Sequence, residues 1–188
     1  MGTEDFVATS GLYWASALVT AVIDLAFVAL LAWRVQPERF RQLKWPLLGA
    51  SLIFWISLWT SVVCWCWDWC YRYVFPSWGH WVIPPVYGLI FGAMGLAFWW
   101  LALHLPGNPV ATFCILGGLQ SLPGHLWAIY GVRMLDKVPI LRAVSPSSAL
   151  VFGVFEFVFY WGVIVIIALV VVRVRDWRRR QAQVRARI

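Results

Sequence analysis

The chain of 188 residues is too apolar for an ordinary soluble domain, because 62% of its residues are hydrophobic and only 12% are charged. We therefore expect an integral membrane protein that forms one compact bundle without a separate soluble domain. The net charge of +7 does not indicate nucleic-acid binding, since seven of the fifteen Lys and Arg residues lie between Arg173 and Arg187, directly after an apolar run. This basic tail, residues 173–188, lies where a cytoplasmic anchor would contact anionic lipid headgroups.

The N-terminal residues "MGTEDF" include two acids, no Lys or Arg and no small-residue cleavage site. We therefore expect no secretory signal peptide and predict that the first apolar segment stays in the mature protein. The chain has four cysteines, which are too few for a disulfide scaffold. All four fall in apolar segments, where buried thiols are common.

Five apolar segments are long enough to cross a membrane, since roughly 20 helical residues span about 30 Å of hydrocarbon. They are Leu12–Trp33, Pro46–Tyr73, Val82–His104, Pro109–Tyr130 and Ala149–Val172. The sequence predicts an all-α bundle of five transmembrane helices in the inner or plasma membrane. With the N-terminus outside, four Lys and Arg after the first span and the seven of the tail lie inside, against four outside, which favours N-out and C-in.

The stretch "CWCWDWCYRYVFPSW", Cys64–Trp78, allows two interpretations. As a β-strand it would carry four candidate zinc ligands on one face: Cys64, Cys66, Asp68 and Cys70. An isolated strand cannot cross lipid, because its backbone polar groups would be unsatisfied. We therefore predict the outer end of a helix that Pro76 terminates, where the thiols no longer converge with the acid. Asp68 then either pairs with Arg72 as an interfacial anchor or serves as a functional acid.

Polar residues of three predicted spans fall at a similar depth. Glu156 lies seven residues after Ala149, roughly 10 Å below the outer surface. His125 lies in the outer third of its span, with Gln120 near the middle, and Asp68 lies near the outer end of the second span. An ionisable residue inside a membrane is costly and is a candidate for function. We therefore expect an outer-half pocket that contains Asp68, His125 and Glu156.

Two further expectations concern the partners of the buried acids. We expect no side chain of its own helix to pair with Glu156, whose neighbours at spacings of three and four are Phe152, Gly153, Phe159 and Tyr160. Asp24, near the middle of the first span, either completes the pocket or pairs with Gln120, and we favour the structural pairing.

A carboxyl group buried among tryptophans loses the hydration of its charged form, so it should stay protonated at neutral pH and act as a proton donor. Indole faces can stabilise a developing cation by about 1–2 kcal/mol each. This chemistry suits protonation of an alkene or epoxide, followed by carbocation reactions. The same pocket would also bind a sterol or prenyl lipid without reacting with it.

A short motif resembles the small integral-membrane terpene cyclases of meroterpenoid and indole-diterpene biosynthesis. It is "WDWCYRYVFPS", Trp67 to Ser77, in which the positions of the family pattern are filled by Trp67, Asp68, Tyr71, Phe75 and Pro76. Glu156 in "FEFVFYW" matches the second acid of the family, in its last span. The fungal members have seven spans, and Asp and Glu are exchanged between the two positions. The resemblance implies that both acids protonate the substrate and help to direct its cyclisation.

The predicted catalytic residues are thus Asp68 and Glu156, with His125 or Gln120 orienting them. The predicted contacts to a hydrophobic isoprenoid or sterol-like substrate are Trp65, Trp67, Trp69, Tyr71, Gln120, His125, Tyr160 and Trp161. The absence of a DDxxD or DxDD motif argues against metal-assisted diphosphate ionisation, and we expect no cofactor or metal. Two alternatives remain. The first is a sterol isomerase or lipid-binding protein similar to the emopamil-binding group, and the second is a Trp-rich subunit of a membrane complex.

Overall fold

A computed structural model describes the backbone of residues 3–185 and the side chains of residues 11–139 and 141–185. The described chain is all-helical and contains no strand, and four of its helices are long and apolar enough to cross a membrane. Residues 1–2 of the N-terminal segment, where no signal peptide was expected, lie outside the described residues. Residues 186–188 of the basic tail, with Arg187, also lie outside them.

Four helices contain the candidate membrane spans: α1 (Thr3–Arg34), α3 (Lys44–Cys66), α4 (Gly79–His104) and α7 (Pro146–Arg185). The fourth apolar segment of the sequence forms α5 (Pro109–Leu126), which continues into the π-helix η2 (Trp127–Gly131). The short elements are α2 (Pro37–Arg41), the 3₁₀-helix η1 (Tyr71–Tyr73), α6 (Met134–Lys137) and the 3₁₀-helix η3 (Pro139–Leu141). The count of five transmembrane helices stays a prediction.

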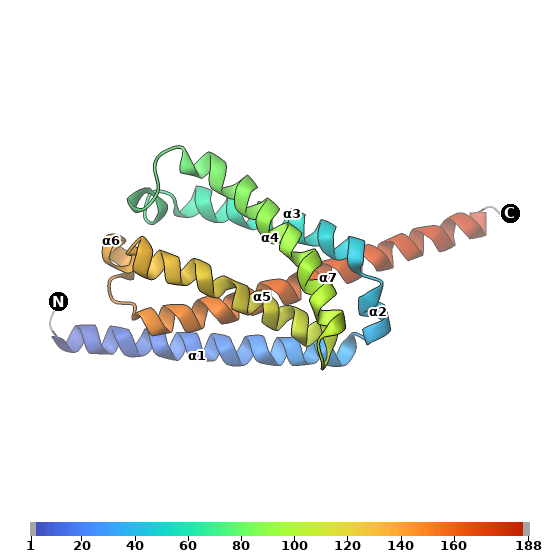
Figure 1. Ribbon diagram of the computed structural model, residues 1–188, viewed down its shortest axis with the longest axis horizontal. Coiled ribbons are helices and arrows are strands. Elements are labelled where there is room, and N and C mark those ends of the chain that lie inside the picture. The colour runs from blue at the N-terminus through green and yellow to red at the C-terminus, as the bar shows by residue number, and fades with distance from the viewer. Residues whose placement is uncertain (1–2, 186–188) are drawn as a thin grey trace.

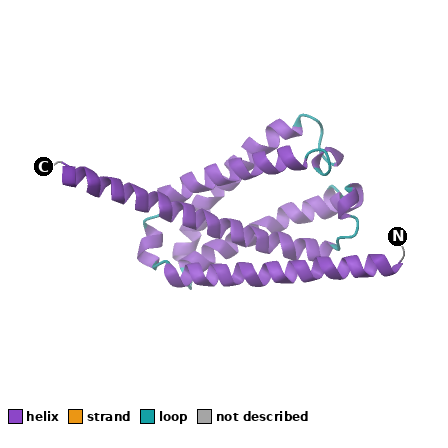
Figure 2. Cartoon of the chain, turned by 180° about the vertical axis from the view of Figure 1, so that it is seen from behind, coloured by secondary structure: helices purple, strands orange, loops and turns teal. Residues whose placement is uncertain are grey.

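The long helices run back and forth along one axis, as Figure 1 shows. α4 packs mainly against α3, whereas α5 and α1 both pack against α7. At the end of the bundle that carries η1 and α6, the α3–α4 pair spreads away from α5 and α7, which Figure 2 shows from behind. At the other end the helices converge, and the last part of α7 extends beyond them.

The convergent half of the bundle is closely packed around Trp161, which is fully buried. Its ring meets Phe98 and Phe113 edge-on, with centroid distances of 5.3 Å to each. Gly117 of α5 lies directly under the indole, and a methyl group at this position would overlap it. Small residues of this kind let helices approach closely where lipid offers no hydrophobic driving force. Trp161 is therefore a packing residue of the core.

α3 ends at Cys66, so it is shorter than the predicted span Pro46–Tyr73. The chain continues as a turn and then as η1. Aromatic residues, Cys and Asp favour helices only weakly, so tertiary contacts decide the local structure here. Cys66 and Cys70 are buried together with Val138, next to η3, in a small apolar cluster. This cluster folds η1 toward the segment that contains α6.

Candidate functional site

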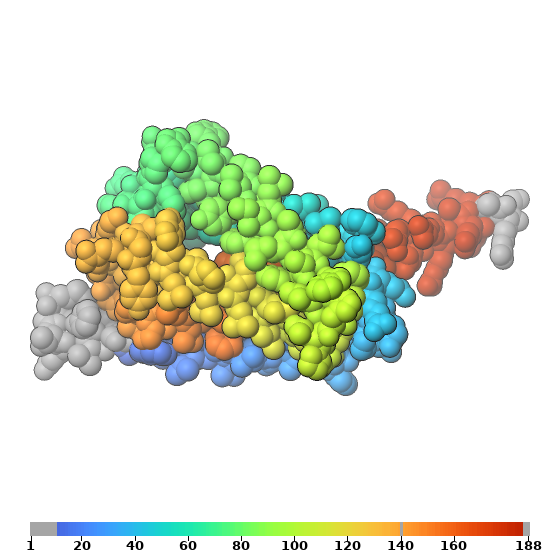
Figure 3. Space-filling model, viewed as in Figure 1, coloured from blue at the N-terminus to red at the C-terminus, as the bar shows by residue number. Residues whose placement is uncertain are grey.

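A cavity of about 500 Å³ lies where the two helix pairs spread apart. Its walls come from α3, α4, α5, α7 and η1, and Figure 3 shows the surface hollowed between α4 and α5. Aromatic side chains dominate the lining: Trp55, Trp59, Tyr71, Phe75, Tyr87, Phe91, Trp127, Phe157 and Tyr160. The cavity therefore has the apolar, aromatic character of a site for a hydrophobic molecule.

The aromatic rings of three helices contact one another around the cavity. Trp55 of α3 lies 5.0 Å from Phe91 of α4 and 5.1 Å from Phe157 of α7, measured between ring centroids. Trp59, one turn further along α3, lies 4.9 Å from Tyr87. The Trp59 indole nitrogen is buried and has no hydrogen-bond partner among the described residues. The wall thus combines π faces with an unused hydrogen-bond donor.

Glu156 of α7 lines the cavity and is only partly exposed. The hydroxyl of Tyr160, one turn later on the same helix, donates a hydrogen bond to Glu156 Oε1. The expectation that no side chain of its own helix pairs with Glu156 is therefore wrong. Tyrosine at spacing i+4 reaches the carboxylate because residues four apart lie on one helix face. The pair places a carboxyl group and its donor on the cavity wall.

His125 of α5 lies opposite Glu156's helix, with its ring 5.8 Å from that of Phe157. Its Nδ1 lies 2.9 Å from the Ser121 carbonyl oxygen, so Nδ1–H donates this hydrogen bond. The imidazole rests directly on Gly153 of α7, where a methyl group would overlap Nε2. Glu156 lies within electrostatic reach of His125. The cavity therefore contains one carboxyl group and one imidazole from different helices.

Two further polar residues complete the lining. Gln120 faces the cavity, and its Oε1 is buried without a hydrogen-bond partner among the described residues. Tyr71 of η1 lines the cavity, as does Met134 of α6. Burial, reinforced by the nearby Cys70 and Cys66 thiols, raises the pKa of the Tyr71 phenol, which therefore stays a neutral donor.

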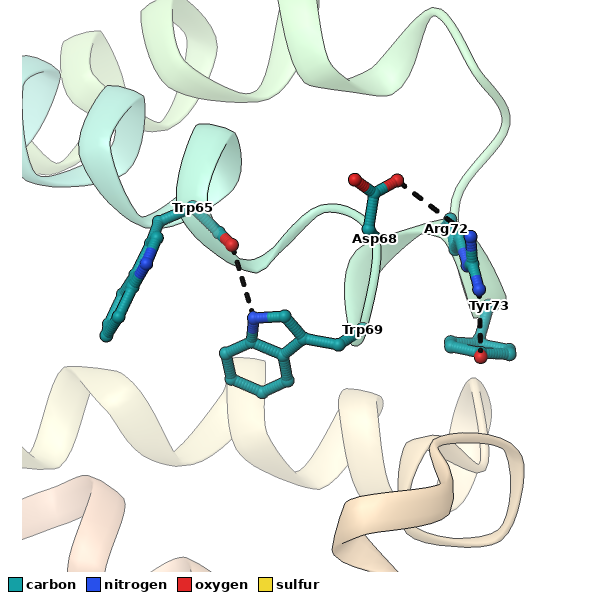
Figure 4. A network of polar contacts seen from close by, with 5 residues as sticks. All are labelled: Trp65, Asp68, Trp69, Arg72 and Tyr73. Atoms are coloured by element: carbon teal, nitrogen blue, oxygen red, sulfur yellow. Dashed lines mark hydrogen bonds and ion pairs between the residues drawn. The ribbon is translucent and has the colours of Figure 1, made fainter.

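Asp68 does not reach the cavity. Its side chain is 88% exposed, and its Oδ1 lies 3.9 Å from Nη1 of Arg72. Figure 4 shows the carboxylate and the indole of Trp69 leaving the turn on different sides, with the indole donating to the Trp65 carbonyl oxygen over 3.2 Å. Because α3 ends at Cys66, Asp68 belongs to the turn and faces outward. This geometry is that of the interfacial Asp68–Arg72 pair, and the structure does not bring Asp68 to Glu156.

The other predicted site residues divide into two groups. Those that line the cavity are Tyr71, Gln120, His125, Glu156 and Tyr160. Those that do not are Trp65, Trp67, Trp69 and Trp161, because Trp161 lies in the core and Trp65 is 81% exposed. Trp67 packs instead on the ring of His80, 5.1 Å away.

Several lining residues were not predicted, above all Trp55, Trp59, Tyr87 and Phe91. A signal for the first two exists in the sequence. Trp55 and Trp59 lie one helical turn apart in the middle of an apolar run, away from the span ends where interfacial tryptophans occur. Tyr87 and Phe91 follow the same spacing on α4, but nothing in the sequence indicates that this face of α4 meets α3.

The described side chains include no group of three or more His, Cys, Asp or Glu that is placed to hold a metal ion. Comparisons with protein-family models, with curated proteins and with solved structures found no match. The groups that line the cavity determine the chemistry it can perform. They are a carboxyl group, an imidazole, an amide and a ring of aromatic faces.

Proposed function

We propose that the protein is a membrane-embedded enzyme that binds a hydrophobic isoprenoid in the cavity and protonates it with Glu156. The observation that carries this proposal is that Glu156 and His125, from α7 and α5, reach one aromatic cavity of about 500 Å³. Small-molecule sites in proteins usually enclose roughly 300–1,000 Å³ and combine apolar walls with a few polar groups. The reaction class is cyclisation or double-bond isomerisation of an alkene.

The proposed reaction is balanced without a cofactor. The Glu156 O–H bond breaks, its proton adds to one alkene carbon, and the π electrons form the new C–H bond. The positive charge then lies on the neighbouring carbon, beside the faces of Trp55 and Trp59. A later intermediate loses a proton to the Glu156 carboxylate, which restores the acid. The Tyr160 hydroxyl stabilises this carboxylate between the two proton transfers.

The same proposal includes five transmembrane helices, with α5 and η2 as the fifth, in the inner or plasma membrane. Figure 1 shows α2 and the C-terminal part of α7 at one end of the bundle and α6 at the other. Lys and Arg gather near α2 and on the C-terminal part of α7, whereas Arg133 directly precedes α6. This distribution supports an N-out, C-in orientation. The basic tail would then contact anionic lipid headgroups on the inner side. The orientation predicts that the loop with Ser77 faces outward.

A second candidate function is binding of a sterol or prenyl lipid without reaction, as in proteins of the emopamil-binding type. The observation that favours it is that Asp68 lies away from the cavity, so Glu156 is the one carboxyl group in the described lining. A two-acid mechanism with Asp68 therefore lacks its second acid. The remaining alternative, a Trp-rich accessory subunit, requires no such cavity.

The test compares Glu156→Gln with Asp68→Asn and the wild-type protein in lipid nanodiscs. Each is incubated with linear isoprenoid alkenes and their epoxides, and products are followed by gas chromatography and mass spectrometry. A general acid contributes roughly 100- to 10,000-fold, so Glu156→Gln should lower conversion by that factor. Asp68→Asn should convert substrate at nearly the wild-type rate. Wild-type conversion by Glu156→Gln contradicts the proposal, and binding without conversion by the wild type supports the second candidate.

A further inference from the structure

Asp24 of α1 is a buried acid that the proposed reaction does not use. The residue is 5% exposed, and its Oδ2 has no hydrogen-bond partner among the described residues. It does not line the cavity. A buried polar atom without a partner is costly, so a membrane protein that keeps one has a use for it. The expected pairing with Gln120 is not seen, since Gln120 Oε1 also lacks a partner among the described residues.

The packing of α1 against α7 shows what Asp24 faces. The two helices run in the same direction (Figure 1). The ring of Phe27 lies 5.1 Å from that of Phe159 and also covers Gly162, which Leu31 approaches from the next turn. Asp24 lies three residues before Phe27 on α1, and Glu156 lies three residues before Phe159 on α7. The two carboxyl groups are therefore level across the α1–α7 interface.

The electrostatics of the site agree with this register. Glu156 and Tyr160 lie within electrostatic reach of Asp24, with no direct hydrogen bond between Asp24 and either residue. Among the described residues, the other titratable groups that line the cavity with Glu156 and Tyr160 are His125 from α5, Tyr71 from η1 and Tyr87 from α4. Two carboxyl groups at one place in a low-dielectric interior cannot both be ionised easily, so such pairs hold a proton between them.

We propose that Asp24 and Glu156 form a carboxyl pair that shares a proton across the cavity wall. Glu156 is the member that faces the cavity, and Asp24 is its buried partner. The pair is inferred from the burial of Asp24 and from the register of α1 against α7. The role of the pair in catalysis rests on the proposed function. In that role Asp24 is a positioning residue, because it acts only through Glu156. It helps to hold the shared proton beside the cavity until Glu156 transfers that proton to the substrate.

Infrared spectroscopy of the protein in nanodiscs at neutral pH tests the pair without any substrate. The measured signal is the carbonyl stretch of protonated carboxyl groups, compared among wild type, Asp24→Asn, Glu156→Gln and the double variant. If the pair exists, each single variant shifts the band that the remaining acid contributes, and the double variant loses both contributions. Asp176→Asn, which removes a half-exposed acid of α7, is the control and should leave the band unchanged.

Independent behaviour overturns the pair: each variant then removes its own band and leaves the other at its wild-type frequency. Absence of any band that depends on either residue overturns it too. Helical circular dichroism and size-exclusion profiles show whether each variant folds. If Asp24→Asn does not fold, the Glu156→Gln spectrum alone decides, by whether the Asp24 band shifts. The outcomes separate the two proposals. Coupled bands in a protein that converts no substrate contradict only the proposed enzymatic function. Lost conversion in Glu156→Gln with uncoupled bands contradicts only the pair.

Discussion

Gly153 fixes the place of His125 in the cavity. The imidazole packs directly on the Gly153 backbone, so even one methyl group at this position overlaps Nε2. We predict that Gly153→Ala moves His125 and destabilises the protein by about 1–3 kcal/mol, the usual cost of overpacking. The thermal unfolding midpoint in detergent measures this change.

Gly124 provides a matched control for Gly153→Ala, because a methyl group there meets open space. Gly124→Ala lies on α5 beside the same cavity and should leave the midpoint unchanged or raise it slightly, since alanine favours helices more than glycine does. Equal midpoints for the two variants would show that His125 does not depend on Gly153.

At the level of single residues, the sequence predicted part of the site. The depth of Glu156, His125 and Gln120 follows from counting residues along apolar spans, and the structure brings all three to one cavity. Asp68 was expected in the same layer because its span was read as helical through Tyr73. Counting gives the depth of a residue but not the rotation of its helix or the turn where the helix ends. The Tyr160–Glu156 bond needed no tertiary information, since the spacing of four residues already allows it.

The turn between α3 and η1 is held by buried cysteines. The pKa of the Cys70 thiol is raised to about 11. Burial is the larger cause, and the nearby Cys66 thiol is the smaller one. Because the thiolate is the reactive form, Cys70 should react slowly with maleimide at pH 7.5 in the folded protein. A variant that retains only Cys70 among the four cysteines should be labelled quickly only after unfolding in SDS. The fraction labelled over time, measured by mass spectrometry, checks this prediction.

The control places one cysteine at Ser77 in a cysteine-free background. Ser77 lies in the exposed loop before α4, so Ser77→Cys should react quickly in the folded protein. In intact cells it should also react with a membrane-impermeant maleimide if the proposed N-out orientation, which places this loop outside, is right. Equal rates for Cys70 and the Ser77 control would contradict burial of the turn. Protection of the Ser77 control in intact cells would contradict the orientation.

The elements themselves were largely predictable, because an apolar run of about 20 residues has few alternatives to a helix in lipid. The end of α3 was not, since Cys66, its last residue, and Cys70, in the turn that follows, pack on Val138, some 70 residues later in the chain. The zinc interpretation fails for a related reason. Without a strand its four candidate ligands do not share a face, and Cys64 is exposed while Cys66 and Cys70 are buried.

The whole molecule is a bundle that is tight at one end and open at the other. Around Trp161 the glycines of α5 and α4 let the helices meet, and near η1 the same helices diverge and leave the cavity. The sequence predicted an all-helical membrane protein, and its count of five spans stays a prediction. It did not predict which pairs diverge, because the hydrophobic faces of lipid-exposed helices carry no strong periodic signal. The cavity is therefore a property of the tertiary arrangement.

Cavity occupancy tests the central claim, which is that this open half binds a hydrophobic isoprenoid. Native mass spectrometry of protein extracted from its membrane in mild detergent should show a bound molecule of isoprenoid or sterol composition. Ala128→Trp, which fills the cavity from its wall, should lose that molecule. Ala29→Trp, a change of the same size on the exposed face of α1, should keep it. A wild-type protein without such a molecule, or an Ala128→Trp variant that retains it equally, would contradict the account.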